Sequence, residues 1–169
     1  MDIAQAFLER SRQYLVREYP AKIQRCLDVL PADALWRRGD ESENSIGNLL
    51  LHLAGNVRQW IVAGVGGAPD VRERSAEFSA HAGHDAATLM ERLRDTLGEV
   101  DAVLAGLDGK QLEEPRRIQG RDVKVLDAVY HVVEHFSMHT GQIILLTKRY
   151  APGHVQFYED ADGLAIPRF

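Results

Sequence analysis

The stretch "VKVLDAVYHVVEHFSMHTGQIILLTKRY", residues 123–150, decides the fold because its pattern is that of one long, mostly apolar helix. Pro152 and Gly153 follow it and end the helical pattern. Four polar or small residues recur at intervals of seven and form a narrow strip: Asp127, Glu134, Gly141 and Lys148. A helix with so narrow a polar side is packed on most of its circumference. The stretch therefore predicts a helical bundle.

Three histidines in this helix, His131, His135 and His139, follow one another at intervals of four residues. A lone histidine is most simply interpreted as an interior residue with a satisfied hydrogen bond. Residues four apart, however, lie close enough to hold one ion between two ring nitrogens, as in the zinc motif HExxH. On an ideal wheel His131 lies nearest the polar strip, whereas His135 and His139 lie roughly 110° and 150° from it. We therefore predict His135 and His139 as metal ligands.

A third ligand must come from another helix, and the stretch "NSIGNLLLHLAGNVRQW", residues 44–60, supplies a candidate. His52, Asn56 and Gln59 follow i, i+4, i+7 spacing and form a polar line along a leucine-rich helix. Such a line can be a polar flank facing water, but together with the histidines of 123–150 it favours a metal site. We predict His52 as the third ligand.

Other polar residues near these positions are predicted to support the site. Four of them are candidates for orienting the ligands: Gln142, Asn56, Gln59 and His131. Trp60 is a candidate for the pocket wall, although an aromatic residue at helical spacing is more often part of a core.

Two more helices are predicted. One covers residues 2–30 with a kink at Pro20, because proline removes a backbone donor. The other begins after Asp85, a good N-cap, and ends at Gly106, and Asn44 or Ser45 caps the helix over 44–60. The sequence thus predicts four helical segments.

The connections between the helices complete the predicted topology. Val65–Gly83 has mixed polarity and no sustained period, and a connection this long in a compact bundle indicates a crossover or a functional lid. Residues 107–122 are predicted as a polar loop, and residues 151–169 show no clear period, so no strand is expected. The fold class is all-α: a four-helix bundle in a single domain, 1–169, with a long connection between helices two and three.

Composition and charge narrow the function classes. The net charge of -5 and the pI near 5.8 argue against a nucleic-acid partner, and "PRRIQGRDVK", residues 115–124, is interpreted as a solvated loop. The N-terminus lacks a signal-peptide core, and no stretch approaches the ~18 apolar residues of a membrane span. We expect a cytoplasmic protein with no membrane partner. Cys26 is interpreted as a buried small hydrophobe, and His81, His84 and His154 as solvated histidines.

A competing motif overlaps the histidines, because "HVVEH" at 131–135 is also H-x-x-E-H. In that motif His131 and His135 bind zinc and Glu134 is the base of a metalloprotease. Glu134 falls on the polar strip, where a solvated charge is expected, and the chain has little room for a protease lobe. The metalloprotease is therefore a remote alternative.

The stretches 44–60 and "HFSMHTGQI", residues 135–143, resemble the DinB-like (YfiT-like) superfamily, in particular a bacterial subgroup of it. The resemblance covers nearly the whole chain and is specific in these two blocks. It implies a four-helix bundle and a divalent metal, often nickel or zinc, bound by one histidine of the second helix and an H-x3-H pair of the fourth, followed by x-G-Q. The ligands so implied are His52, His135 and His139, with Gln142 in the last position.

The resemblance also implies a function, since characterised relatives include metal-dependent transferases and isomerases that use thiols such as bacillithiol or mycothiol, and such proteins are commonly dimers. Three neutral imidazoles leave coordination positions for water or substrate, as expected of a catalytic site. Our hypothesis is a homodimeric thiol S-transferase or isomerase acting on an electrophilic small molecule. The alternative is a metal-stabilised bundle that binds a small molecule or a partner without turnover, because no general acid or base is evident beside the histidines.

Overall fold

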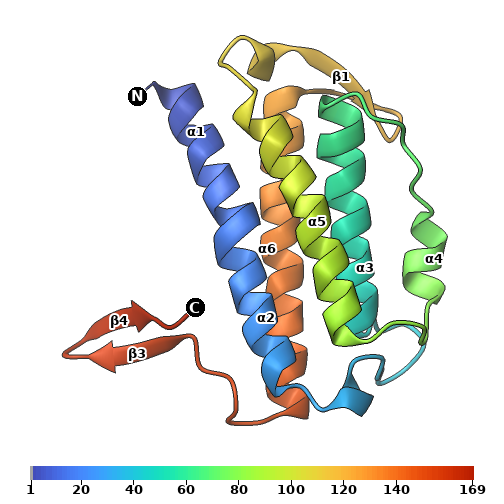
Figure 1. Ribbon diagram of the computed structural model, residues 1–169, viewed down its shortest axis with the longest axis vertical. Helices are drawn as coiled ribbons and strands as arrows, with labels where there is room; N and C mark the ends of the chain where they lie inside the picture. Colours follow the sequence, from blue (N-terminus) through green and yellow to red (C-terminus); the bar gives the residue numbers. More distant parts are fainter. Residues whose placement is uncertain (1) are drawn as a thin grey trace.

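The structure is a computed structural model that describes residues 2–169, and it confirms the mostly helical fold. Four long helical rods run side by side along the long axis of the molecule (Figure 1). The first two rods are composite: α1 (Ile3–Arg12), the π-helical η1 (Gln13–Glu18) and α2 (Tyr19–Val29), then α3 (Ile46–Val57) and the π-helical η3 (Arg58–Val65). The third and fourth rods are α5 (Ala86–Ala105) and α6 (Val125–Tyr150).

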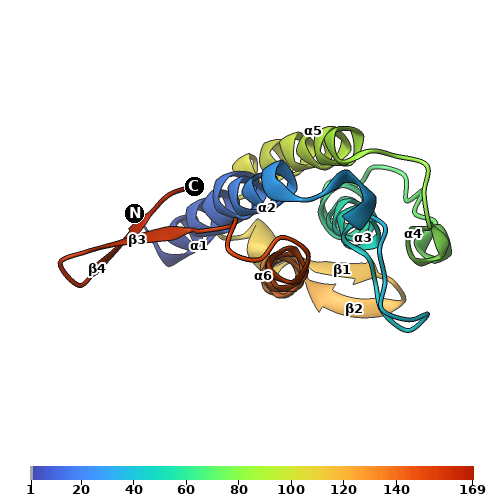
Figure 2. The same cartoon turned by 90° about the horizontal axis from the view of Figure 1, so that it is seen from below.

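The rods enclose one apolar core. In the view along the bundle, α6 lies against α2 and α3, while α5 covers α3 and the first rod from the opposite side (Figure 2). Side chains from all four rods fill the centre, and the largest fully buried ones are Phe136, Leu15, Ile23, Ile46, Leu49, Leu50, Leu53, Ile61, Met90, Leu93, Leu97 and Leu104. Burial of each such side chain contributes about 1.5–3 kcal/mol. The apolar core therefore determines how the rods pack.

The helix boundaries follow the predicted signals. Ser45 caps α3, and its side chain and that of Asn48 form a reciprocal capping box. Asp85 caps α5 through Thr88 N–H, and Gly106 ends it. Pro20 produces no sharp break: the preceding residues widen into η1, a π-helical segment that accommodates the missing backbone donor within one continuous rod.

The predicted long connection Val65–Gly83 contains a short helix, α4 (Arg74–Ser79), which lies along the outside of α3 (Figure 1). Asn48 Nδ2 donates to the backbone carbonyls of Glu77 and Ala80 at 2.8 Å each. Arg38 donates to Ala80 O at 2.7 Å. These bonds attach the end of α4 to the start of α3.

The expectation of no strand was wrong. Two antiparallel hairpins are present, β1 (Pro115–Ile118) with β2 (Arg121–Lys124) and β3 (Tyr158–Ala161) with β4 (Leu164–Pro167). Both turns have two residues with positive φ, Gln119–Gly120 and Asp162–Gly163. This conformation is typical of the turn that joins two short antiparallel strands. The stretch 115–124, predicted as a solvated loop, is therefore a hairpin at one end of the bundle.

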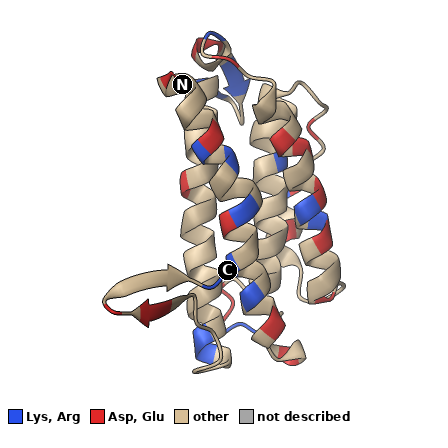
Figure 3. Ribbon diagram, turned by 60° about the vertical axis from the view of Figure 1, so that its left-hand side comes forward, with Lys and Arg blue, Asp and Glu red and all other residues tan. Residues whose placement is uncertain are grey.

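The faces of α6 agree with the predicted strip. Asp127, Glu134, Gly141 and Lys148 are all exposed, and His139 is buried. The helix is packed on less of its circumference than predicted, because Leu126 and Ser137 are also exposed. Elsewhere basic and acidic residues are interspersed along the helices (Figure 3). No helix in residues 2–169 is long and apolar enough to cross a membrane.

Candidate metal centre

Three histidines from two helices converge in the gap between α3 and α6. His52 Nε2 lies 3.0 Å from His135 Nε2, which in turn lies 3.1 Å from His139 Nε2. One nitrogen from each ring lies within 4.8 Å of the other two. His135 and His139 are one helical turn apart on α6, and His52 faces them from α3. The structure thus brings the three predicted ligands together.

Hydrogen bonds fix the ring tautomers of two of the three histidines. His52 Nδ1 lies 2.9 Å from Glu77 Oε2, and since a carboxylate only accepts, His52 donates from Nδ1. Arg72 Nη2 also lies 3.1 Å from this nitrogen, but it has its own acceptor in Glu77 Oε2 at 2.8 Å. His139 Nδ1 donates to Gln142 Oε1 at 2.7 Å. The Nε2 atoms of His52 and His139 therefore carry lone pairs that point toward His135.

Burial keeps two of the three imidazoles, those of His135 and His139, neutral. Desolvation, with the proximity of His139 and His52, lowers the pKa of His135 to about 3. Desolvation also lowers the pKa of His139, although the hydrogen bond with Gln142 opposes this. Neutral imidazole is the form that binds a metal.

The donor set fits a divalent cation. If His135 Nε2 carries a proton, it can donate to only one of its two neighbours, and if it carries none, its lone pair faces theirs; in either case at least one N···N contact of about 3 Å is not a hydrogen bond. Two nitrogens bound to one tetrahedral zinc ion at about 2.0–2.1 Å would lie roughly 3.3–3.4 Å apart. The observed separations of 3.0 Å and 3.1 Å are slightly shorter, so a small outward movement of the rings would bring them to that spacing. A cation between the rings would remove the repulsion, so these residues could hold a metal ion.

Glu77 and Arg72 support His52 and were not predicted. Arg72 binds Glu77 through Nε and Nη2, at 2.7 Å and 2.8 Å, and both side chains are buried. Burial would raise the pKa of Glu77, but the hydrogen bonds from Arg72 and His52 outweigh it and lower that pKa. The carboxylate is thus ionised and orients His52, as a partner of a metal-binding histidine does.

Gly55 makes room for this carboxylate. A Cβ at Gly55 would lie 2.0 Å from Glu77 Oε1, so no other residue fits here without displacement. The available signal was therefore a glycine three residues after His52, on the same side of a leucine-rich helix, because such a glycine often marks a close approach of another group.

The remaining predicted site residues divide into those that support a histidine and those that do not. Gln142 binds His139 directly, as described above. Gln59 supports His52 indirectly, because its Oε1 accepts a hydrogen bond from Arg72 Nη1 at 2.9 Å, and Arg72 holds Glu77. Asn56 is buried, but within residues 2–169 it makes no hydrogen bond to the histidines. The last two, His131 and Trp60, form a separate pair.

The rings of His131 and Trp60 pack against each other beside the cluster, with centroids 4.2 Å apart and planes tilted by 48°. Burial lowers the pKa of His131, whose ring centroid lies 5.4 Å from that of His135. Glu134 is exposed on α6, so the geometry favours the three-histidine cluster over the H-x-x-E-H arrangement. Trp60 Nε1 and His135 Nδ1 are buried without a hydrogen-bond partner among residues 2–169.

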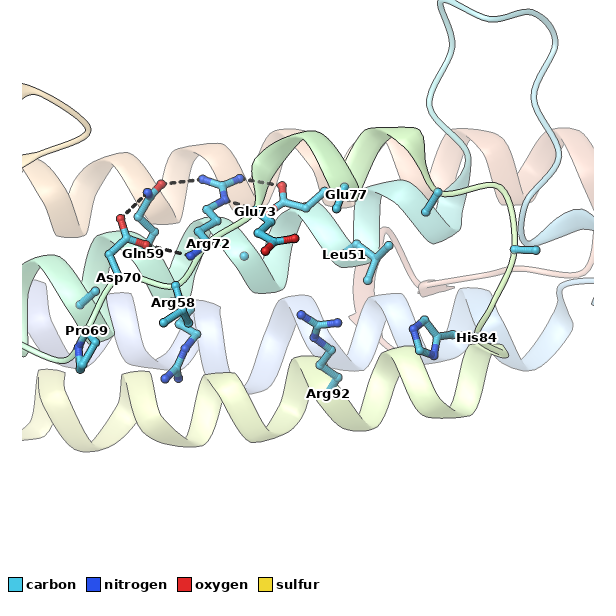
Figure 4. A pocket seen from close by; sticks show the side chains of 16 residues that line it. Leu51, Arg58, Gln59, Pro69, Asp70, Arg72, Glu73, Glu77, His84 and Arg92 are labelled. Atoms are coloured by element: carbon cyan, nitrogen blue, oxygen red, sulfur yellow. Dashed lines mark hydrogen bonds and ion pairs between the residues drawn. The ribbon is translucent and has the colours of Figure 1, made fainter.

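A cavity of about 430 Å³ lies on the side of α3 that α4 covers (Figure 4). Its wall includes Arg72 and Glu77, and Figure 4 shows Arg72 between Gln59 and Glu77. The two residues that orient His52 therefore also form part of the wall of this cavity. Cys26 is buried in the core, and burial raises its thiol pKa, as expected of an unreactive cysteine. His81, His84 and His154 are exposed and do not belong to the cluster.

The fold and the cluster define a class of protein, a helical bundle that has the fold of solved DinB-like proteins and three histidines that could hold a metal ion. A DinB-like protein, YjoA of Bacillus subtilis, has a structure similar to that of this chain. The similarity covers 89% of this chain and 98% of YjoA, with a TM-score of 0.66 and 14% sequence identity. A DinB-like protein of Bacillus cereus is similar over 86% of this chain and 94% of its own, with a TM-score of 0.65 and 19% identity. At these identities the likeness concerns the fold.

The amino-acid sequence identifies the family to which the chain belongs. The family model described as "Protein of unknown function (DUF1572)" matches residues 2–163, so the chain belongs to this family. Comparison with curated protein sequences gives no match.

Proposed function

We propose that His52, His135 and His139 bind one divalent metal ion, zinc or nickel, and that the protein is a cytoplasmic metal-dependent thiol S-transferase or isomerase. The convergence of three imidazoles, with Nε2 separations of 3.0 Å and 3.1 Å, carries the proposal. The imidazole set alone does not select the metal, since zinc, nickel, copper and iron all accept it. The resemblance to DinB-like proteins favours zinc or nickel.

In this proposal each chain residue has a defined task. The three histidines hold the ion, which when bound would lower the pKa of a coordinating thiol. Glu77 and Gln142 hold the Nδ1 protons of His52 and His139, so both Nε2 atoms face inward. Arg72 keeps Glu77 ionised. Three protein ligands leave coordination positions for the thiol.

We also propose that the protein is a homodimer, as the resemblance implies. Two large apolar side chains on α6 support this, because they are exposed along one helix: Tyr130 at 62% and Met138 at 51%. A dimer that buries them would dissociate in a Met138→Asp variant. Sedimentation velocity of both proteins tests this, and a wild type that is monomeric at micromolar concentration would contradict it.

The first experiment is elemental analysis of protein purified without a histidine tag, alongside His52→Ala and His135→Ala. We expect close to one metal ion per chain in the wild type and none in either variant. His154→Ala, an exposed histidine outside the cluster, is the matched control and should keep its metal. A wild type that contains no metal and takes up neither zinc nor nickel would overturn the proposal.

The second experiment separates an enzyme from a binder. A panel of low-molecular-weight thiols is incubated with an electrophilic reporter and the metal-loaded protein, and conjugation is compared with that of His139→Ala. Metal-dependent conjugation supports the transferase. Tight thiol binding without turnover would identify a non-catalytic binding protein instead.

A further inference from the structure

A second hollow, of about 490 Å³, lies between the loop before α3 and the C-terminal half of α6. Apolar and polar side chains both line it: Ser42, Glu43, Asn44, Leu49, Gln142, Leu145, Leu146 and Arg149. We call it the α6 groove. Tyr150 Oη donates to Arg37 O at 3.4 Å, a bond that links the chain just before this loop to the end of α6. The two walls of the α6 groove are thus held together by a tertiary hydrogen bond.

The α6 groove lies next to the histidine cluster and is connected to it through Gln142. Gln142 lines it and at the same time accepts from the ligand candidate His139 at 2.7 Å. From there Leu145, Leu146 and Arg149 follow at helical spacing along α6. A molecule with its reacting end at the cluster would therefore lie along the α6 groove, past two leucines, and end near Arg149.

Arg149 is a positively charged residue of the α6 groove whose side chain is available to bind a ligand. Within residues 2–169 its guanidinium makes no hydrogen bond and no ion pair. Glu43, the acidic residue of the lining, has a carboxylate oxygen that accepts from Gly39 N–H at 2.8 Å. The acid is thus engaged by its own loop, whereas the guanidinium can bind a carboxylate or phosphate with two parallel hydrogen bonds.

We infer that the α6 groove binds the distal part of the thiol substrate, and that this part is an apolar chain ending in an anionic group held by Arg149. The inference rests on the proposed function for the reacting end, and it adds the substrate class. Leu145 and Leu146 contact the chain, and Gln142 lies at the junction with the metal ligands.

Three matched thiols test this: 6-mercaptohexanoate, 6-mercaptohexanol and 6-aminohexanethiol. They share the thiol and the chain and differ only in distal charge. Affinities are measured from the thiolate absorption band of protein loaded with cobalt(II). We expect the carboxylate to bind roughly two- to fivefold more tightly than the alcohol, the range of an exposed ion pair. Arg149→Ala should remove this preference, and Arg149→Glu should transfer it to the amine.

Lys148→Ala is the matched control, because it removes a neighbouring positive charge that does not line the α6 groove. It should leave the preference unchanged, which excludes a general charge effect. Equal affinities for the three thiols, an Arg149→Glu variant that behaves as wild type, or a wild-type preference for the amine would each overturn the inference.

A metal-free arm separates this inference from the proposed function. Hexanoate and hexanol are titrated into the protein in the presence of a chelator, and the binding heat is compared between the wild type and Arg149→Ala. Arg149-dependent binding of hexanoate, together with a metal-loaded protein that shows no thiolate band, would support the α6 groove and contradict the transferase. A thiolate band with no selectivity in either arm would support thiol binding at the metal and contradict the proposed role of the α6 groove.

Discussion

The two helices that form the histidine cluster support their ligands in different ways. On α3, His52 is held by a buried, charged pair, Glu77 and Arg72, that comes from a separate segment of the chain. On α6, His139 is held by the neutral Gln142 three residues further along, and His135 Nδ1 has no partner in residues 2–169. The α3 half is therefore preorganised by tertiary structure, and the α6 half by helical spacing alone. Damage to the α3 support should affect both folding and metal binding.

The largest effect is expected from Glu77→Gln. The substitution leaves the buried Arg72 without its counter-charge, which should lower the free energy of unfolding by about 3–5 kcal/mol. It also weakens the orientation of His52, and loss of such a partner typically lowers metal affinity by about 10- to 100-fold. Urea denaturation and metal competition with a chromophoric chelator measure the two effects.

The double variant Arg72→Met, Glu77→Gln separates the two contributions. Replacement of a buried ion pair by apolar groups is often neutral for stability, so the double variant should recover most of the lost free energy of unfolding. It should not recover the metal affinity, because His52 still lacks its carboxylate. Equal stability of all three proteins would mean that the α3 half is not preorganised in this way.

A smaller effect is expected from Gly55→Ala, which acts on the same half through space alone. The new Cβ would lie 2.0 Å from Glu77 Oε1, and relief of such overpacking costs about 1–3 kcal/mol. Gly98→Ala on α5 is the matched control, since nothing lies within 4 Å of its Cβ, and it should stabilise the helix by about 1 kcal/mol. Thermal unfolding of both variants checks the sign, and a stabilised Gly55→Ala would contradict the close approach.

Gln142→Ala tests the α6 half and should leave stability nearly unchanged. The residue is exposed, so we expect a change in unfolding free energy within about 0.5 kcal/mol. Metal affinity should still fall, by about tenfold, because the Nδ1 proton of His139 loses its acceptor. If stability fell as much as in Glu77→Gln, the proposed contrast between the two halves would be wrong.

The same contrast explains what the sequence could predict. His135 and His139 lie four apart on one helix, so their proximity follows from helical geometry, and His52 could be added from the polar line on α3. Gln142 was accessible for the same reason, because it is three residues from His139. The four rods were predicted from apolar periodicity, and the caps of two of them from residue type, Asn44 or Ser45 for α3 and Asp85 for α5.

What the sequence could not predict depends on contacts between distant segments. Glu77 belongs to a six-residue helix with no periodicity of its own, and only its docking on α3 buries the carboxylate. The hairpins were missed because each strand has four residues and little alternation, although Asp162–Gly163 is a recognisable turn sequence. The rings of Trp60 and His131 pack against each other, and this contact could not be predicted from the residue pattern of either helix alone.

The smallest effect is expected from Gly141→Ala, within the motif that resembles DinB-like proteins. Gly141 lies in the middle of α6, and a Cβ there would meet nothing within 4 Å. Alanine should therefore stabilise the helix by up to about 1 kcal/mol and leave metal affinity unchanged. Thermal unfolding and metal titration check both statements. A loss of stability or of metal would show that another surface approaches this face in the working protein, and with Met138 exposed one turn before Gly141 on α6, that surface would be the second copy of the proposed dimer.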